Sequence, residues 1–349
     1  MRTERYQGVM LHPEEVEVLR LLEEQIGRPI PQVSEMVWHT FGFIAELNRI
    51  TRLGLFSLGL TSLPESLDHL RHLKELTLGY NQLSSLPESL GNLVHLKHLD
   101  LWGNQFSSFP KTIVRLVNLE YLSLSSNPFS SLSENMEQLV NLYELHLWGN
   151  QLTSLPAPIS RLVNLERLIL SHNQLSSLPE SISHLVNLKL LGLDNNQFSS
   201  LPETISHLAN LTHLDLSNNQ LSSLHMAIGN LVRLQYLDLK GNQLFSLPES
   251  FGQLSRLRSL DLTGNLFHTA SLADQLRLLW LSRKIKPLTE YVPTALFAHP
   301  LVQGLKLESL KQLDNQFCSY CGASGVVQGV EIESGQKRVF CASCENAIS

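Results

Sequence analysis

The sequence predicts an α/β solenoid in which short strands stack into one parallel sheet, and three observations support this. First, a 23-residue unit repeats nine times without insertion or deletion from Ile50 to Arg256, and a tenth copy starts at Leu257 and breaks down after Phe267. Second, each unit contains a Leu-x-Leu pair, the alternation of a short strand. Third, a proline at the fifteenth position of most units separates this strand from a second half that is too short for a long helix. A fixed period of this size means that each unit buries its apolar face against its neighbours.

The unit Leu96–Asn118 shows the frame, which reads L-x-x-L-x-L-x-x-N-x-L/F-x-x-L/F-P-x-x-I/L-x-x-L-x-x. Strands that stack at ~4.8 Å form a ladder that satisfies their own amides. The half that follows the proline is expected to form one 3₁₀ or α turn on the convex side. Ser133 replaces the proline in the fourth unit and His225-Met226 replaces Pro-Glu in the eighth. We expect both replacements to relax the convex turn locally.

The ninth position carries an asparagine in nine units, and Leu58 takes its place in the first. A buried side-chain amide must satisfy its donors and its acceptor. We therefore expect these amides to bond backbone groups where the chain leaves each strand, which is a structural role. The residues are Asn81, Asn104, Asn127, Asn150, Asn173, Asn196, Asn219, Asn242 and Asn265.

This frame resembles the leucine-rich repeat family, most closely the 23-residue intracellular class that includes Ras-group and prokaryotic members. The resemblance holds in register through all nine complete units. It implies a horseshoe with its parallel sheet on the concave face, and it implies a surface that grips another macromolecule. It also makes a small GTPase or signalling protein a candidate partner.

Composition narrows the class of protein. The chain has 349 residues, 43% of them hydrophobic, and a net charge of -6, so it can bury a large core and is not suited to general nucleic-acid binding. No apolar run approaches the ~18 residues of a membrane span, and the start of the sequence has no apolar signal core. Extracellular members usually have disulfide-bonded caps, whereas residues 1–270 contain no cysteine. A reducing cytoplasm is therefore the expected compartment.

Four regions are predicted: an N-terminal cap over 1–49, repeats over 50–270, a C-terminal helical cap or linker over 271–316, and a zinc-ribbon-like module over 317–349. The ends of an open solenoid must be capped. At the N-terminal end, Pro13–Ile26 reads as a helix that Gly27 stops. It would be followed by the strand 41–47, a tight turn at Asn48-Arg49 and the first repeat strand 50–55, which together make a hairpin that covers the sheet edge.

At the C-terminal end, 271–284 is amphipathic, and the stretch 289–316 looks helical in pieces. The four cysteines follow in the spacing C-x₂-C-x₁₉-C-x₂-C, as Cys318, Cys321, Cys341 and Cys344. Two such pairs complete a tetrahedral site, which predicts one structural Zn²⁺ ion. A redox dithiol pair and rubredoxin-like iron are the alternatives. Residues between the pairs alternate around 333–336, which predicts a hairpin that joins the two pairs.

Side chains at positions two, three, five, seven and eight of each unit point out of the concave face, and we expect them to take no part in the hydrophobic core. Aromatic residues gather there in the early and middle units, and Trp102 and Trp148 share position seven two units apart. Exposed aromatic residues of this kind mark recognition sites. The predicted partner-binding residues are Tyr80, His98, Trp102, Tyr121, Tyr143, His146, Trp148 and Arg167.

Later units are acidic on the same face. Asp194, Asp215, Asp238 and Asp261 line it, broken by Lys189, Lys240 and Arg258. We expect the aromatic half to anchor a partner and the acidic half to steer a basic segment of that partner. The alternative is that this face has no binding role and contacts only solvent.

No catalytic motif is evident. A G-x-x-x-x-G-K-[ST] phosphate loop and a G-x-S-x-G elbow are both absent, and the cysteines occur only as metal-type pairs. The sequence therefore predicts a non-enzymatic protein-binding scaffold or regulator. The alternative is an adaptor that recruits targets to a modifying enzyme or a small GTPase complex. A membrane partner is not expected, nucleic acid is disfavoured, and the sequence does not specify an oligomeric state.

Overall fold

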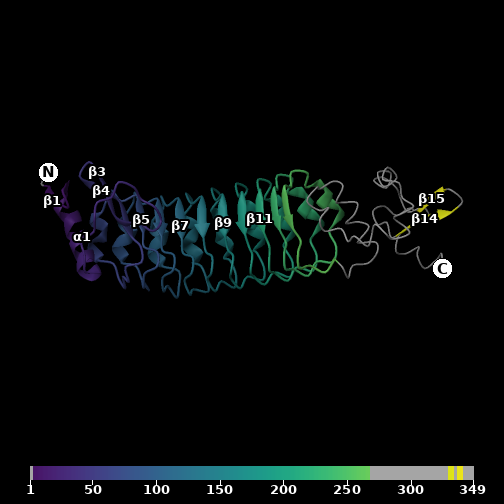
Figure 1. Cartoon of the computed structure of the whole chain (residues 1–349), viewed down its shortest axis with the longest axis horizontal. Helices are drawn as coiled ribbons and strands as arrows, with labels where there is room; N and C mark the ends of the chain where they lie inside the picture. The colour runs from purple at the N-terminus through teal and green to yellow at the C-terminus, as the bar shows by residue number, and fades with distance from the viewer. Residues whose placement is uncertain (1–2, 268–328, 334–335, 341–349) are drawn as a thin grey trace.

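A computed structural model describes residues 3–267, 329–333 and 336–340. Each repeat contributes one strand to a single sheet, and the strands lie side by side along an elongated stack (Figure 1). The first repeat strand, β4, spans Arg49–Leu55, and the nine later repeats each contribute a three-residue strand. These are β5 Glu75–Thr77, β6 His98–Asp100, β7 Tyr121–Ser123, β8 Glu144–His146, β9 Arg167–Ile169, β10 Leu190–Gly192, β11 His213–Asp215, β12 Tyr236–Asp238 and β13 Ser259–Asp261.

The register of the sheet repeats the period of the sequence. Arg52 pairs with Glu75, Glu75 with His98, and His98 with Tyr121, so every parallel partner lies 23 positions further along the chain. The sheet has eleven strands in the order β3 to β13, because the N-terminal strand β3 (Phe41–Glu46) adds to its edge. The predicted parallel solenoid is therefore confirmed.

One five-residue 3₁₀ helix follows each strand from β4 to β12, as predicted for the convex turn. In most repeats the proline precedes the helix in an extended conformation, which suits its fixed φ. The helices are η1 Glu65–His69, η2 Glu88–Asn92, η3 Lys111–Arg115, η4 Glu134–Gln138, η5 Ala157–Arg161, η6 Glu180–His184, η7 Glu203–His207, η8 Met226–Asn230 and η9 Glu249–Gln253.

The expectation that the turn relaxes where the proline is replaced was wrong. Helices η4 and η8 have the same length as the others, and Ser133 and His225 keep the extended backbone of the proline column. Each replacement caps its helix instead. The Ser133 hydroxyl accepts from the Asn135 amide at 3.2 Å, and His225 Nδ1 accepts from the Ala227 amide at 3.2 Å. A side-chain cap satisfies an otherwise unpaired helical amide and so preserves the turn.

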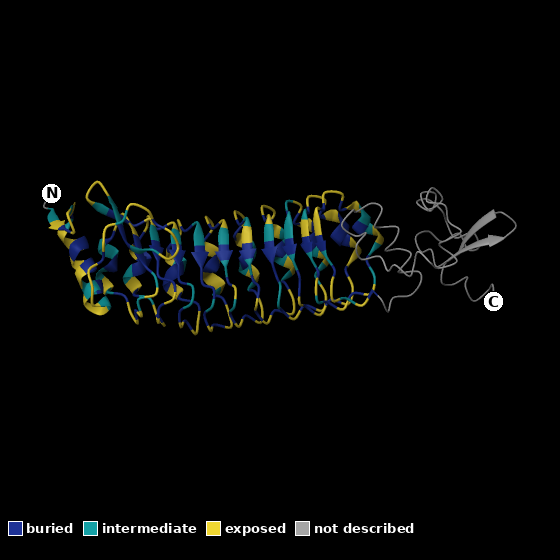
Figure 2. Cartoon of the chain, in the orientation of Figure 1, coloured by how far each residue is buried: buried dark blue, intermediate teal, exposed yellow. Residues whose placement is uncertain are grey.

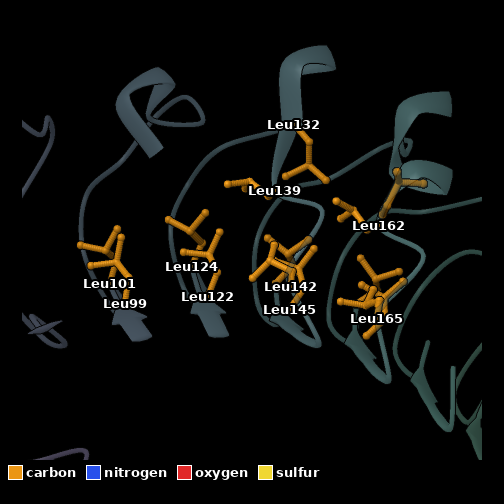
Figure 3. Close-up of a cluster of buried hydrophobic side chains, with 14 of the residues drawn as sticks. Leu99, Leu101, Leu122, Leu124, Leu132, Leu139, Leu142, Leu145, Leu162 and Leu165 are labelled. Atoms are coloured by element: carbon orange, nitrogen blue, oxygen red, sulfur yellow. The ribbon is translucent and has the colours of Figure 1, made fainter. Parts of the chain in front are cut away.

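The core lies between the sheet and the 3₁₀ helices (Figure 2). In Figure 3, Leu99 and Leu122 lie in β6 and β7, Leu101 and Leu124 directly follow these strands, and Leu132 and Leu139 lie nearer the helical turns. All six are buried. Since the same apolar positions recur in each repeat, one continuous apolar core runs the length of the stack. This explains how so short a unit is stable.

The asparagine ladder forms as predicted. In the Asn104 side chain, Oδ1 accepts from the Leu83 amide at 3.0 Å, and Nδ2 donates to the Leu78 and Leu101 carbonyls at 3.0 and 2.9 Å. Each asparagine therefore bonds both its own repeat and the preceding one. A second, outer ladder was not predicted. In it Asn118 Nδ2 donates to the Val94 carbonyl at 2.8 Å, and the same bond recurs at Asn141, Asn164, Asn187 and Asn210.

The predicted N-terminal helix is present as α1, Pro13–Ile26, and Gly27 ends it in a left-handed conformation. Three apolar side chains of α1, Val16, Leu19 and Leu22, are buried. Glu15, an acidic residue in the first turn of the helix, is buried too. Its carboxylate accepts from the Ile50 amide at 3.1 Å and faces Arg49, and burial raises its pKa. It therefore ties α1 to the first repeat.

Two features of the N-terminal region differ from the prediction. The strand that pairs with β4 ends at Glu46, which pairs with Arg49, so the turn is Leu47-Asn48 and not Asn48-Arg49. Both turn residues have positive φ, and Asn tolerates this conformation better than most residues. A short hairpin of β1 (Glu4–Tyr6) and β2 (Val9–Leu11) precedes α1 and was not predicted.

At the other end, β14 (Gly329–Glu333) and β15 (Gln336–Phe340) pair in antiparallel register. This agrees with the hairpin expected between the cysteine pairs. The four cysteines and the predicted helical segments at 271–284 and 289–316 lie outside the described residues.

Candidate functional site

The open face of the sheet, defined by positions two, three, five, seven and eight of each repeat, is the candidate site. Its centre is formed by strand residues and its carboxyl edge by the residues just after each strand. The predicted residues His98, Tyr121, His146 and Arg167 lie in β6 to β9, in the centre. Tyr143 precedes β8, and the edge carries Tyr80, Trp102 and Trp148.

The central residues form one row of contacts across four strands. His98 stacks on Tyr121 with ring centroids 4.0 Å apart, and Tyr121 lies 5.3 Å from His146. His146 Nε2 lies 2.7 Å from Glu144 Oε1, and Arg167 approaches the same carboxylate at 3.7 Å. The structure therefore brings His98, Tyr121, His146 and Arg167 together.

The centre of the face is more buried than predicted. Position five was expected to be free of core duty, yet Asp100 is 5% exposed and Ser123 is buried as well. Burial raises the pKa of Asp100, whose carboxylate accepts from the Trp102 amide at 2.9 Å. Burial lowers the pKa of His98 to about 4, so this imidazole is neutral at physiological pH. The side chains in the centre of the open face are thus closely packed in these repeats.

The carboxyl edge exposes the aromatic rings. Trp148 is 40% exposed and Tyr80 is 52% exposed, so both side chains reach solvent on this face. Trp102 is only partly exposed, because its ring packs edge-on against Tyr80 at 4.5 Å and its Nε1 donates to Ser126 Oγ at 3.2 Å. The two tryptophans are therefore unequal, and Trp102 forms the inner part of a cluster.

Two further aromatic residues join that cluster and were not predicted. Trp38, from the segment between α1 and β3, lies 6.0 Å from Trp102 and 5.3 Å from Phe56. Phe56 in turn contacts Tyr80 at 5.5 Å. Trp38 is 57% exposed, so the N-terminal region extends the aromatic surface. The repeat frame could not reveal this, because Trp38 lies outside the repeats.

The acidic half is an aligned ladder. Asp215, Asp238 and Asp261 pair in register on β11, β12 and β13, and Asp194 lies at position seven of the repeat before them. Asp215 accepts from the Ser217 amide and Asp238 from the Lys240 amide, each at 2.9 Å. Asp100 makes the same cap at position five of the third repeat, but the first, second and fourth to seventh repeats have no acid there, so the cap alone does not account for three carboxylates on successive strands.

The raised pKa values of Asp215 and Asp238 in the acidic ladder predict a stability that depends on pH. Burial first, and then the neighbouring carboxylates, raises the pKa of Asp215 and of Asp238. An acid whose folded pKa lies above its unfolded value favours folding when protonated, so stability is greatest below the unfolded pKa and is lost as pH rises through the folded pKa.

We therefore expect Asp215→Asn combined with Asp238→Asn to raise the free energy of unfolding at pH 7 by up to about 1 kcal/mol, since these side chains are partly solvated. The amide oxygen still caps Ser217 and Lys240. Melting temperatures measured from pH 7 down to pH 3 should show the gain shrink as the carboxylates of the wild type become protonated. A gain that is constant with pH would contradict this account.

Within the described residues, no group of three or more His, Cys, Asp or Glu side chains is arranged to hold a metal ion. No helix in this part of the chain is long and apolar enough to cross a membrane. The candidate site consists of the aromatic, histidine and carboxylate side chains of the open face.

Comparison with known proteins agrees with this architecture. The leucine-rich repeat family matches residues 48–106, 71–129, 140–198, 199–244 and 211–267, which together cover more than half of the chain. The protein therefore belongs to the leucine-rich repeat family. None of the curated proteins searched matches the chain significantly.

Solved structures give further similarities. The leucine-rich repeat ectodomain of the Arabidopsis thaliana receptor kinase GASSHO1/SCHENGEN3, in complex with CASPARIAN STRIP INTEGRITY FACTOR 2, is 30% identical with a TM-score of 0.60, over 71% of this chain and 32% of that one. The plant peptide hormone receptor RGFR1 in complex with RGF2 is 25% identical with a TM-score of 0.50, over 62% and 44%. A Leptospira interrogans leucine-rich repeat protein is 27% identical over 68% and 82%, with a TM-score of 0.35. This chain therefore spans less than half of either plant receptor.

Proposed function

We propose that this protein is a non-enzymatic scaffold or regulator that binds a protein partner on the open sheet face. The observation that carries the proposal is the exposed aromatic edge, where Tyr80, Trp102 and Trp148 lie on one rigid sheet. Rings fixed by neighbouring rings lose little entropy when a partner covers them, and such residues dominate binding energy in many interfaces. The two plant receptors that resemble this chain were solved in complex with CASPARIAN STRIP INTEGRITY FACTOR 2 and with RGF2, which supports a binding role.

The acidic ladder gives the partner a charge preference. Asp194, Asp215 and Asp238 lie beyond the aromatic edge on the same face, and the net charge of the chain is also negative. Opposite charge on a partner would speed its encounter and orient it, while the aromatic residues supply most of the affinity. We therefore propose a partner with a basic segment.

The absence of cysteine from the first 270 residues favours a cytoplasmic protein, and we propose that location. The partner would be a signalling protein, with a small GTPase as one candidate class. An adaptor is the second candidate function. It is supported by the two C-x-x-C pairs, which form a unit separate in sequence from the repeats and available for a second contact.

We also propose that Cys318, Cys321, Cys341 and Cys344 hold one structural Zn²⁺ ion. Four thiolates match the tetrahedral preference of zinc and leave no open position for catalysis. The antiparallel pairing of β14 with β15 supports the proposal, because a hairpin between the two cysteine pairs is what a zinc-ribbon-like module requires.

The binding proposal is tested by affinity capture from lysate of the source cell with the whole chain as bait. We expect Trp102→Ala combined with Trp148→Ala to weaken partner binding by at least about 100-fold, since each buried hot-spot aromatic contributes 2 kcal/mol or more. A variant that ends at Gln316 tests the adaptor alternative.

Val163→Ala is the matched control, because Val163 is 45% exposed but lies outside the open face. Partners that the tryptophan variant loses and the control retains would identify the aromatic edge as the binding site. If the tryptophan variant retains every partner, the proposal fails, and loss only on truncation would favour the adaptor.

A further inference from the structure

The carboxyl edge of the sheet carries a palindromic row of side chains that the repeat itself does not require. Across the second to sixth repeats, positions eight and seven present Tyr80, Trp102, the pair Ser125-Ser126, Trp148 and His172 in that order. A ring pair therefore lies on each side of the serines, with the tryptophan nearer the serines and the smaller ring further out.

The two ring pairs have similar separations. Trp102 packs against Tyr80 at 4.5 Å on one side, and Trp148 packs against His172 at 5.1 Å on the other. Each tryptophan thus packs against its outer neighbour, and the serines lie between the two tryptophans. Both serines bond to the tryptophans: Ser126 Oγ accepts from Trp102 Nε1 at 3.2 Å, and Ser125 Oγ accepts from the Trp148 amide at 3.1 Å.

The backbone gives an independent indication that the outer rings have a role. Position eight adopts a left-handed conformation throughout the stack, and the column is otherwise Gly, Ser or Asn; Tyr80 has φ 56° and His172 has φ 55°. A bulky residue in this conformation costs roughly 1–2 kcal/mol, which Gly avoids. Strain retained at the two symmetric positions of one surface feature points to function.

The spacing leaves room for a flat group. Trp102 and Trp148 lie two strands apart, which is ~10 Å along the sheet. This exceeds the ~7 Å at which a planar group would touch a ring on each side at ~3.5 Å, so a group in this gap stacks on one of the two indoles. The charge next to the row is negative: Asp194 Oδ2 lies 3.7 Å from His172 Nε2, and the ladder of Asp215 and Asp238 continues beyond it.

From this row and its charge we infer that the edge from Trp38 to His172 binds an extended segment that lies across the strands, with an arginine guanidinium between Trp102 and Trp148. The inference rests on the proposed function and names the chemistry of the partner. A guanidinium is flat, cationic and weakly hydrated, so it stacks on indole and also suits the nearby carboxylates, whereas a lysine ammonium offers only its charge.

The test is calorimetric titration of the whole chain with three synthetic peptides of equal length, in which glycine alternates with arginine, with lysine or with tryptophan. We expect the arginine peptide to bind at least about tenfold more tightly than the lysine peptide, a difference that stacking of a desolvated guanidinium supplies. Trp102→Ala combined with Trp148→Ala should abolish this preference. Trp102→Phe combined with Trp148→Phe should restore most of it, since the ring faces remain.

Tyr80→Gly combined with His172→Gly removes the outer rings, and the positive φ at both positions is one that glycine adopts without strain. This variant should also lose the arginine preference while it remains folded, which its circular dichroism and melting curve would show. A retained preference would overturn the inference.

Other outcomes contradict the inference in separate ways. Equal binding of the arginine and lysine peptides would mean that the site recognises positive charge alone. Tighter binding of the tryptophan peptide would mean that the site prefers an uncharged aromatic ring. If no peptide binds but the tryptophan variant still loses its captured partner, the inference fails while the proposed function stands. If captured partners are also unaffected, both fail.

Discussion

Asn127→Leu is expected to lower the free energy of unfolding by about 3–5 kcal/mol, since each buried group left without a partner costs about 1–3 kcal/mol. Asn127 is 2% exposed. Its Oδ1 accepts from the Phe106 amide, and its Nδ2 donates to the carbonyls of Leu101, Leu124 and Ser125 at 3.0 to 3.1 Å. Leucine has a similar size but satisfies none of these groups.

The loss should act between repeats as well as within one, because Asn127 bonds the third repeat from the fourth. In a solenoid the interface between neighbours carries much of the stability. Urea unfolding followed by circular dichroism should therefore show a lower midpoint and a broader transition.

Asn118→Leu is the matched control. Asn118 belongs to the outer ladder, where its side chain is exposed and Nδ2 donates only to the Val94 carbonyl. Water can replace that bond, so the expected loss is below about 1 kcal/mol. If the two variants unfold at the same midpoint, the inner ladder does not have the role that its hydrogen bonds indicate.

The contrast between the two ladders shows what the sequence can predict about this fold. A strict period with Asn at position nine predicts the strand, the register and the inner ladder, because only one burial pattern satisfies them. The outer asparagines look like ordinary polar residues, since exposed positions impose no single partner. Similarly, Ser133 and His225 look like defects in a motif, but their side chains cap the turn that the proline otherwise prepares.

The candidate site was predicted only in part. The side-chain alternation placed Tyr80, Trp102 and Trp148 on one face, but it could not predict that Asp100 is buried, since burial there depends on side chains from the neighbouring strands. Trp38 was missed for a similar reason. Its contact with Trp102 joins segments far apart in sequence, and only the position of the N-terminal region on the sheet edge brings them together.

Removal of the proposed zinc ion is expected to unfold the module that contains the four cysteines and to leave the repeats folded. A unit of about 30 residues buries too little apolar area to fold alone, so metal binding must supply most of its stability. The free energy of binding structural zinc is on the order of 10–16 kcal/mol at pH 7. The repeats within the described residues contain no cysteine and no cluster that could hold a metal, so a chelator has no site there.

The measurement combines metal analysis with limited proteolysis of the whole chain. We expect one zinc ion per chain before chelation, and after it rapid cleavage beyond Gln316 with an unchanged melting temperature for the repeats. Cys341→Ser should reproduce the chelated state, because three thiolates hold zinc far more weakly than four. Val330→Ala, in β14 and not a ligand, should keep its metal. A tail that resists protease without metal, or one that binds iron in place of zinc when purified from its source, would refute the zinc proposal.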